Sequence, residues 1–285
     1  MQQPVKLIEC PRDAMQGIHD FIPTDIKAAY INLLLQVGFD TIDFGSFVSP
    51  GAIPQLRDTR EVLSKLDLSA TSSGLLAIVA NLRGAQEAVS FEEINYLGFP
   101  FSISETFQQR NTNTTILQSM DVVKQMLELC DRNDKTAVVY LSMGFGNPYG
   151  DPWDVEILEH WATELVDNGV KILSLSDTTG ISSPEKIKTI LPALISKFNS
   201  TEIGLHLHSI PSTRLEKIEA AYECGCTRFD SALKGFGGCP MAADDLTGNL
   251  ATEDLIDYLD TRGVSLDFDM DKWQEALAFS SRVFL

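Results

Sequence analysis

The stretch Ile203-Gly204-Leu205-His206-Leu207-His208-Ser209 has the alternating pattern of a β-strand and carries two of the four histidines in the chain. Residues i and i+2 of a strand point to the same face, so His206 and His208 are expected to project side by side. Two adjacent imidazoles supply half of a metal site, which one or two oxygen ligands would complete. The alternative is two unrelated histidines, one buried and the other exposed to solvent.

Other apolar runs in the chain resemble strands, and helical patterns separate them. We predict strands at 5–9, 41–45, 75–80, 94–102, 136–142, 171–176, 203–209 and 228–232. Helices are predicted at 24–35, 184–198 and 212–223, the first with Thr24 as its N-cap and a stop near Gly38, and a shorter, weaker helical pattern lies at 84–89. This alternation predicts one α/β domain over residues 1–285, a (β/α)8 TIM barrel, and a doubly wound sheet is the alternative.

A barrel of this type places its chemistry at the C-terminal ends of its strands and in the loops that follow them. Polar residues occupy several of these ends, namely Glu9 to Asp13, Asp43, Ser46, Asp177, His206 and His208. They are far apart in the sequence, but a closed barrel would gather them around one mouth. We therefore expect a single functional site there, with the two histidines as part of it.

The chain is strongly acidic, with 22 basic residues against 40 acidic ones and a formal net charge of −18 at pH 7. A nucleic-acid partner would need clustered lysine and arginine, so this class of partner is not expected. An anionic substrate would need a local basic pocket that works against the overall field. No apolar run reaches the roughly 20 residues of a membrane helix, so no membrane association is expected.

The five cysteines are expected to be reduced thiols. Their odd number in a long chain, with no secretory signal visible at Met1–Lys6, predicts a cytoplasmic protein. Cys224-Gly225-Cys226 lies at a predicted helix-to-strand turn without a second pair of cysteines. We expect these two cysteines to be structural rather than a redox or metal pair.

Loops that follow the predicted strands carry the candidate catalytic groups. Asp13 can bind a metal and Arg12 can hold an oxyanion, although such neighbours also form ordinary surface ion pairs. Asp177 can position a general base, or it can simply stabilise the turn after its strand. A glycine-rich loop presents Cys239 for proton transfer, unless it is a flexible turn with an incidental cysteine. Asn249 supplies an amide oxygen that suits a hard cation.

Together these motifs resemble those of the 3-hydroxy-3-methylglutaryl-CoA lyase family, which is part of a superfamily of metal-dependent barrel lyases and Claisen-type synthases. The resemblance covers nearly the whole chain. It rests on ECPRDAMQ at 9–16, SFVSP at 46–50, SETF at 104–107 with Asn111, SDTTG at 176–180, HLH at 206–208, and GGCP at 237–240 leading into GNLATEDL at 248–255. The first and last segments are the most specific, since the histidine pair is shared across the superfamily.

The resemblance implies that one Mg²⁺ or Mn²⁺ is bound by Asp13, His206, His208 and Asn249. It implies cleavage of an acyl-CoA substrate into acetyl-CoA and acetoacetate. His206, helped by Asp177, would take the hydroxyl proton, and Arg12 would offset the charge of the thioester enolate. Cys239 would protonate the new acetyl carbon. The remaining site residues are the carboxylate of Asp43 and the substrate-placing side chains of Gln16, Asn111 and Ser46.

The chain also departs from the family pattern. Ala14 replaces a glycine, Asp43 a glutamate and Ser209 an aspartate, and the spacing from Cys239 to Asn249 is one residue longer. Asp244 and Asp245 occupy a part of this segment that is normally small and neutral. The alternatives are a related enzyme for another 3-hydroxyacyl-CoA or a 4-hydroxy-2-oxo acid, a Claisen-type condensing enzyme, and a non-catalytic barrel. A homodimer is implied by the resemblance alone.

Overall fold

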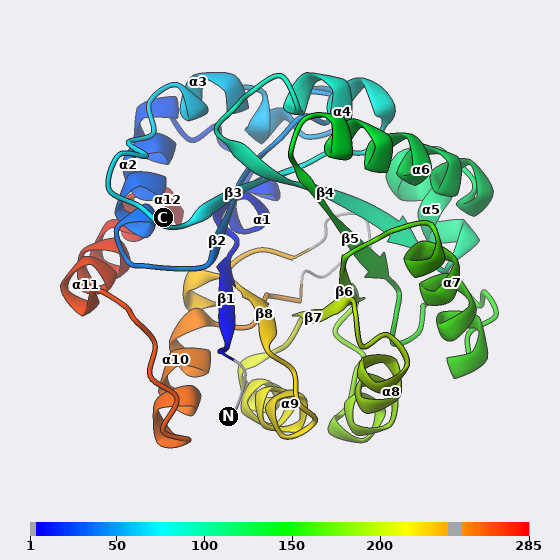
Figure 1. Cartoon of the computed structure of the whole chain (residues 1–285). Helices are drawn as coiled ribbons and strands as arrows, with labels where there is room; N and C mark the ends of the chain where they lie inside the picture. The colour runs from blue at the N-terminus through cyan, green and yellow to red at the C-terminus, as the bar shows by residue number, and fades with distance from the viewer. Residues whose placement is uncertain (1–3, 239–246, 285) are drawn as a thin grey trace.

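The chain folds into a closed barrel of eight parallel strands, seen from one end in Figure 1. The computed structural model describes residues 4–238 and 247–284. The strands are β1 Lys6–Glu9, β2 Thr41–Ser46, β3 Gly74–Ile78, β4 Ile94–Ser102, β5 Thr136–Ser142, β6 Ile172–Asp177, β7 Glu202–Leu207 and β8 Arg228–Ser231. Pairing of β1 with β8, from Lys6–Arg228 to Glu9–Ser231, closes the barrel. The TIM-barrel prediction is therefore confirmed, and the open doubly wound sheet is wrong.

Helices follow the strands, and most of them form the outer layer of the barrel, whereas α1 lies over its end (Figure 1). They are α1 Pro11–Gln16, α2 Thr24–Leu35, α3 Thr59–Leu63, α4 Leu82–Ala88, α5 Glu105–Thr112, α6 Ile116–Arg132, α7 Val155–Asp167, α8 Pro184–Lys197, α9 Pro211–Glu223, α10 Thr252–Thr261, α11 Met270–Phe279 and α12 Ser281–Phe284. Two short 3-10 helices are η1 Pro54–Leu56 and η2 Leu233–Gly235. Among the described residues, no helix is both long enough and apolar enough to cross a membrane.

The predicted strands match the observed ones to within one or two residues at each end. The predicted N-cap of α2 is wrong, because Pro23 occupies that position and Thr24 is already helical. The Thr24 hydroxyl instead donates to Asp58, 2.8 Å away, and so ties α2 to the segment that precedes α3. The turn prediction for Cys224 and Cys226 is confirmed, since the intervening Gly225 has φ +88° between α9 and β8.

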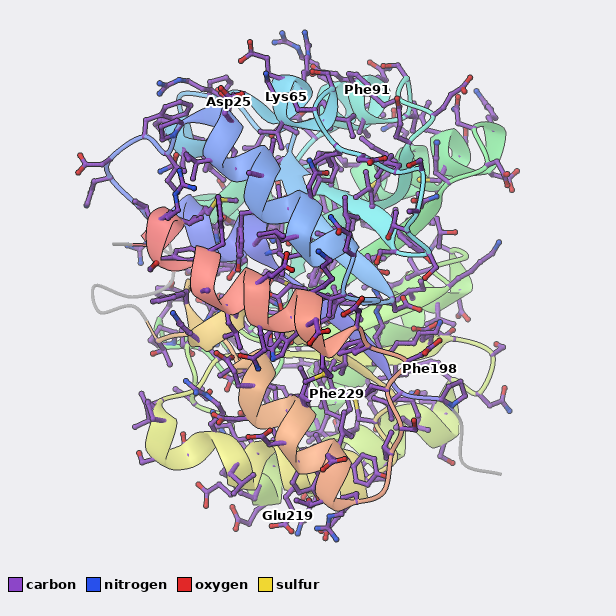
Figure 2. The ribbon with its side chains drawn as sticks, turned by 90° about the vertical axis from the view of Figure 1, so that its left-hand side faces the viewer. Asp25, Lys65, Phe91, Phe198, Glu219 and Phe229 are labelled. Carbon is purple, nitrogen blue, oxygen red and sulfur yellow. The ribbon has the colours of Figure 1, made fainter. Side chains whose placement is uncertain are left out.

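The strands separate two hydrophobic regions. Outward-facing side chains pack against the helices and form the main core. A second cluster consists of Leu76, Ile78, Val138, Tyr140 and Ile172, which alternate with main-core residues along their strands and so lie inside the barrel. The C-terminal helices complete the outer layer, and Figure 2 shows α11 lying beside α2. Phe279 of α11 stacks on Tyr30 of α2, with ring centroids 6.5 Å apart.

Candidate functional site

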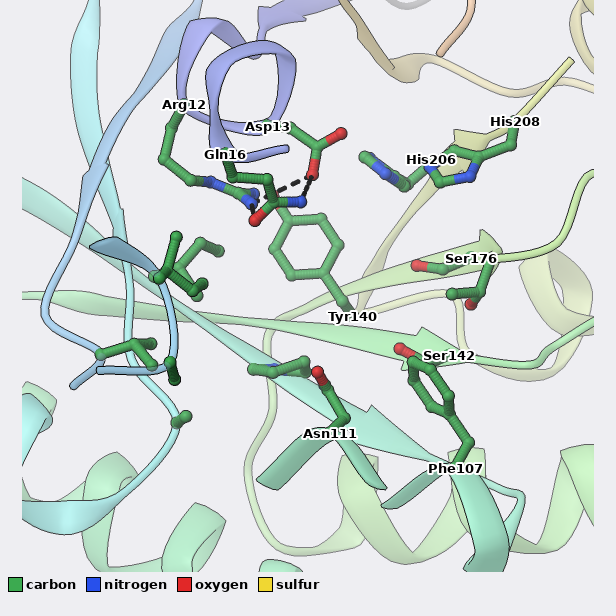
Figure 3. Close-up of a pocket in the computed structure, with 17 residues that line it drawn as sticks. Arg12, Asp13, Gln16, Phe107, Asn111, Tyr140, Ser142, Ser176, His206 and His208 are labelled. Carbon is green, nitrogen blue, oxygen red and sulfur yellow. Dashed lines mark hydrogen bonds and ion pairs between the residues drawn. The ribbon is translucent and has the colours of Figure 1, made fainter. Parts of the chain in front are cut away.

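A cavity of about 150 Å³ opens at the C-terminal mouth of the barrel (Figure 3). Its lining combines apolar side chains with a smaller polar group that contains both histidines of β7. The lining residues are Arg12, Asp13, Gln16, Val48, Ala52, Ile53, Ile78, Ala80, Pro100, Phe107, Asn111, Tyr140, Ser142, Ser176, Thr178, His206 and His208. An apolar pocket with a few convergent polar groups is the usual form of a small-molecule site.

The two histidines lie side by side, with ring centroids 5.2 Å apart. Both are buried, so the alternative of one buried and one exposed histidine is wrong. Burial and the neighbouring His206 lower the pKa of His208 to about 4, so this imidazole is neutral at physiological pH. His208 also forms a hydrogen bond with the backbone of Thr178, while its Nε2 is buried without a partner among the described residues. A neutral imidazole with one nitrogen lone pair left free is suited to a metal ion.

Asp13 brings an acidic oxygen to the same place. Ligand atoms of Asp13, His206 and His208 lie within 4.8 Å of one another, a grouping that could hold a metal ion. Burial alone would raise the pKa of Asp13, but the charges of Arg12 and the two histidines outweigh it and lower the pKa to about 2. Asp13 is therefore an ionised carboxylate, the form that binds a cation.

Asn249 reaches this cluster from the segment between β8 and α10, where its backbone forms an isolated antiparallel β-bridge with that of His208. Its amide nitrogen donates to Asp13 Oδ2 at 2.7 Å and to the carbonyl of Phe236 at 2.8 Å. The nitrogen, rather than the oxygen that would bind a cation, therefore faces Asp13. Ligation by Asn249 would require a rotation of its terminal amide.

Arg12 lies in the mouth between two carboxylates. Its Nε donates to both oxygens of Asp43, at 3.1 and 2.9 Å. Its Nη1 donates to Asp13 at 3.0 Å and to Gln16 at 2.9 Å (Figure 3). Burial raises the pKa of Asp43 to about 6, although Arg12 opposes this shift. The shorter side chain at this position still reaches Arg12, so the departure from glutamate preserves the contact.

Asp177 lies at the end of β6, as expected, but its contacts are with the turn that follows. Its oxygens accept hydrogen bonds from the backbone of Ile181 and Ser182 and from the hydroxyl of Ser182. Lys217 pairs with it at 3.1 Å, and both side chains are buried. These contacts match the turn-stabilising alternative, and none of them is with His206.

The partner of His206 is Asp230 on β8, a residue that the sequence analysis missed. Asp230 Oδ2 lies 3.2 Å from His206 Nδ1, and both residues are buried. The two residues are directly paired in the β7–β8 register. The signal was present in the strand 228–232, but strand pairing has to be known before it can be used. The thiol of Cys10 also lies within 4.8 Å of these two side chains.

Replacing Asp230 with asparagine should weaken metal binding at this site. The carboxylate accepts from His206 Nδ1 and so leaves Nε2 as the nitrogen with a lone pair, whereas the asparagine amide can donate and stabilise the opposite tautomer. We expect a loss of about 10- to 100-fold in affinity for Mn²⁺, measured by electron paramagnetic resonance of the free ion. The matched control is Asp257→Asn on α10, and an unchanged affinity in Asp230→Asn would contradict the role.

Of the remaining predicted site residues, some lie in the described part of the chain and others lie outside it. Asn111 on α5 lines the cavity, but Ser46 donates to the carbonyl of Ile78 at 3.3 Å and faces a neighbouring cavity. Cys239, with Asp244 and Asp245, lies outside the described residues. The glycine-rich loop that precedes it does approach the site closely, because a Cβ at Gly237 would lie 2.8 Å from Asn249 Nδ2 and from the carbonyl of Asp13.

Comparison with known proteins agrees with this geometry. The HMGL-like family model matches residues 5–279. The chain is 34% identical to a hydroxymethylglutaryl-CoA lyase of Bacillus subtilis over 92% of this chain and 87% of that protein. It is 33% identical to the cytoplasmic 3-hydroxy-3-methylglutaryl-CoA lyase of Rattus norvegicus over 95% of this chain and 79% of the relative.

Solved structures give the same result. A crystal structure of the Bacillus subtilis HMG-CoA lyase aligns with a TM-score of 0.91 at 32% identity and covers 99% of this chain and 94% of that one. An HMG-CoA lyase of Acinetobacter baumannii, in complex with coenzyme A and 3-methylmalate, aligns with a TM-score of 0.89 at 31% identity over 99% and 91% of the two chains. With a family model that matches nearly its whole length, the chain belongs to the HMGL-like family.

Proposed function

We propose that this protein is a divalent-metal-dependent carbon–carbon lyase that cleaves 3-hydroxy-3-methylglutaryl-CoA into acetyl-CoA and acetoacetate. The observation that carries the proposal is the convergence of Asp13, His208 and Arg12 on one apolar cavity. An ionised carboxylate and a neutral imidazole suit a cation, and the adjacent guanidinium suits an anionic intermediate. The relatives that cover most of the chain are named for this reaction.

In this proposal Asp13, His206, His208 and Asn249 hold Mg²⁺ or Mn²⁺. The bound cation would act as a Lewis acid toward the hydroxyl and carboxylate of the substrate. The unpartnered Nε2 of His208 and the ionised oxygens of Asp13 are the best-suited ligands, because neither has to lose a proton. Both Mg²⁺ and Mn²⁺ accept mixed nitrogen and oxygen ligands of this kind.

His206 is the proposed acceptor of the hydroxyl proton. Burial lowers its pKa, but the hydrogen bond and charge of Asp230 outweigh this effect and raise the pKa above the ordinary value. Asp230 therefore takes the supporting role first expected of Asp177. Because Asp230 occupies Nδ1, the hydroxyl proton would be accepted at Nε2, the same atom that would otherwise bind the cation.

Loss of the hydroxyl proton allows the adjacent carbon–carbon bond to break, which gives the ketone of acetoacetate and a thioester enolate. Arg12 is placed to stabilise the enolate oxygen, and its orientation is fixed by the two-oxygen contact with Asp43. Gln16 and Asn111 would place the substrate. Cys239 would return a proton to the acetyl carbon, which yields acetyl-CoA.

The proposal is tested by assaying acetyl-CoA release from 3-hydroxy-3-methylglutaryl-CoA with added Mg²⁺ or Mn²⁺. We expect cleavage that EDTA abolishes and that re-added cation restores. A parallel panel of other 3-hydroxyacyl-CoA thioesters and a 4-hydroxy-2-oxo acid tests the alternatives raised by Ala14 and Ser209. Cleavage of none of these substrates by folded, metal-supplemented protein would contradict the lyase function. A homodimer and a cytoplasmic location remain predictions.

A further inference from the structure

A second cavity of about 380 Å³ lies beside the first on the rim of the barrel. It is formed by the segments after β2 and β3 and by helices α3 and α4, and we call it the rim groove. Its lining residues are Ser46, Phe47, Val48, Ser49, Pro50, Leu56, Arg57, Thr59, Arg60, Asn81, Arg83, Gly84 and Glu87. Val48 lines both cavities, so the rim groove adjoins the site that contains the histidines.

The rim groove is basic, although the protein as a whole is strongly acidic. Arg57, Arg60 and Arg83 line it, and Glu87 is the one acidic residue in its lining. Glu87 is occupied by Arg60, whose Nη2 lies 2.6 Å from its carboxylate. Arg57 and Arg83 form no ion pair within residues 4–238 and 247–284. Two guanidinium groups thus line the groove without a carboxylate partner, in a chain with 40 acidic residues and 22 basic ones.

Arg57 is also held in place on the groove wall. Its guanidinium carbon lies 3.6 Å from the centroid of the Phe21 ring, and its Nη1 donates to the carbonyl of Pro54 at 3.4 Å. The following residue, Asp58, is anchored by the buried Lys27 at 2.7 Å. A stacked guanidinium on an anchored segment loses little freedom when it binds an anion, and its planar donors match a phosphate.

Other cations near the barrel mouth are already engaged. Arg214 pairs with Asp254 at 2.8 Å, Lys217 with Asp177 at 3.1 Å, and Lys186 donates to the carbonyl of Phe145 at 2.9 Å. Arg110, which lies over the ring of Tyr149 at 5.1 Å, is the competing anchor for an anion. The rim groove differs from Arg110 in presenting several guanidinium groups together, as a ligand with more than one phosphate requires.

We propose that the rim groove binds the phosphate groups at the nucleotide end of the acyl-CoA substrate, chiefly through Arg57 and Arg83. This inference rests on the proposed function, because the acyl end of the same molecule would occupy the cavity that contains the histidines. The substrate would cross from one cavity to the other over Val48. The groove then supplies the local basic region that an anionic substrate needs in a protein of this net charge.

The test compares two substrates that share one acyl group, the CoA thioester and the pantetheine thioester, which lacks the phosphates. For Arg83→Glu and for Arg57→Glu we expect the KM of the CoA thioester to rise by about tenfold or more, which is the effect of losing one charge-assisted contact. The kcat/KM for the pantetheine thioester should stay at the wild-type value in each variant. Arg132→Glu, at the far end of α6, is the matched charge-reversal control.

Equal effects on both substrates, or no effect on either, would overturn the proposal. A selective effect in Arg110→Glu alone would place the phosphates at the competing anchor and would also overturn it. Binding of adenosine 3′,5′-bisphosphate, measured by calorimetry, tests the groove without catalysis, and its affinity should fall at least about tenfold in Arg83→Glu. If the wild-type protein cleaves neither thioester but binds this bisphosphate through Arg83, the proposed reaction fails while the phosphate site stands.

Discussion

Replacing His208 with alanine is expected to lower cleavage of 3-hydroxy-3-methylglutaryl-CoA by about a thousandfold or more. Nε2 of His208 is buried without a hydrogen-bond partner in the described part of the chain, and the low pKa of this histidine keeps it neutral. A metal site that loses such a ligand loses Lewis-acid stabilisation of several kcal/mol, and each ~1.4 kcal/mol is a factor of ten in rate. The measurements are kcat at saturating Mn²⁺ and the Mn²⁺ affinity of the variant.

His160→Ala is the matched control, because His160 is exposed on α7 and does not line the cavity. The control should retain wild-type kcat and Mn²⁺ affinity. His208→Ala should also keep the unfolding transition of the wild type within a few degrees, which separates loss of the ligand from loss of the fold. If His208→Ala cleaves the substrate at a rate within tenfold of wild type, the metal site is not where we place it.

The strands could be predicted because each one carries its own signal in the sequence. An apolar run between turn residues identifies a buried strand, and the number of runs then limits the fold to very few choices. The ends of helices depend on single contacts, and there the prediction was weaker. Thr24 is a residue type common at N-caps, but Pro23 occupies the N-cap with a non-helical ψ of 139°, and Thr24 is the first helical residue.

Within the candidate site, the sequence could identify only those residues whose side-chain type and motif indicate a function. His206, His208 and Asp13 have side chains that can bind a metal ion, and the structure brings them together. Asp230 has no local signal, because its role depends on the register between β7 and β8. The reverse holds for Asp177, whose position suggested catalysis but whose oxygens are occupied by the following turn.

The basic character of the rim groove could not be predicted from the sequence either. The net charge of −18 indicates that an anionic substrate needs a local basic region on this protein. Nothing in the sequence shows that Arg57 and Arg83 share a cavity, since 25 residues and a strand separate them. Net charge is a sum over the chain, whereas binding depends on the charges that line one cavity.

Replacing Arg12 with lysine should lower kcat by about 100- to 1000-fold, the usual effect of losing one donor to a developing oxyanion. Lysine keeps the positive charge between Asp13 and Asp43, so the buried carboxylates remain compensated. It loses the planar group that contacts both oxygens of Asp43 and also reaches Gln16. The defect should therefore appear in the rate of cleavage and leave Mn²⁺ affinity within a few-fold of wild type.

Arg12→Ala supplies the contrast that separates catalysis from folding. It removes the charge as well as the geometry and leaves Asp43, which is fully buried, without a cation. Breaking a buried pair in this way destabilises a protein by about 3–5 kcal/mol, so the alanine variant should unfold at lower denaturant while the lysine variant does not. If Arg12→Lys retains kcat within tenfold, then a positive charge alone is sufficient at this position and the oriented guanidinium is not required. If both variants lose kcat equally and the lysine variant is as stable as wild type, the oriented donor, rather than the charge, stabilises the enolate.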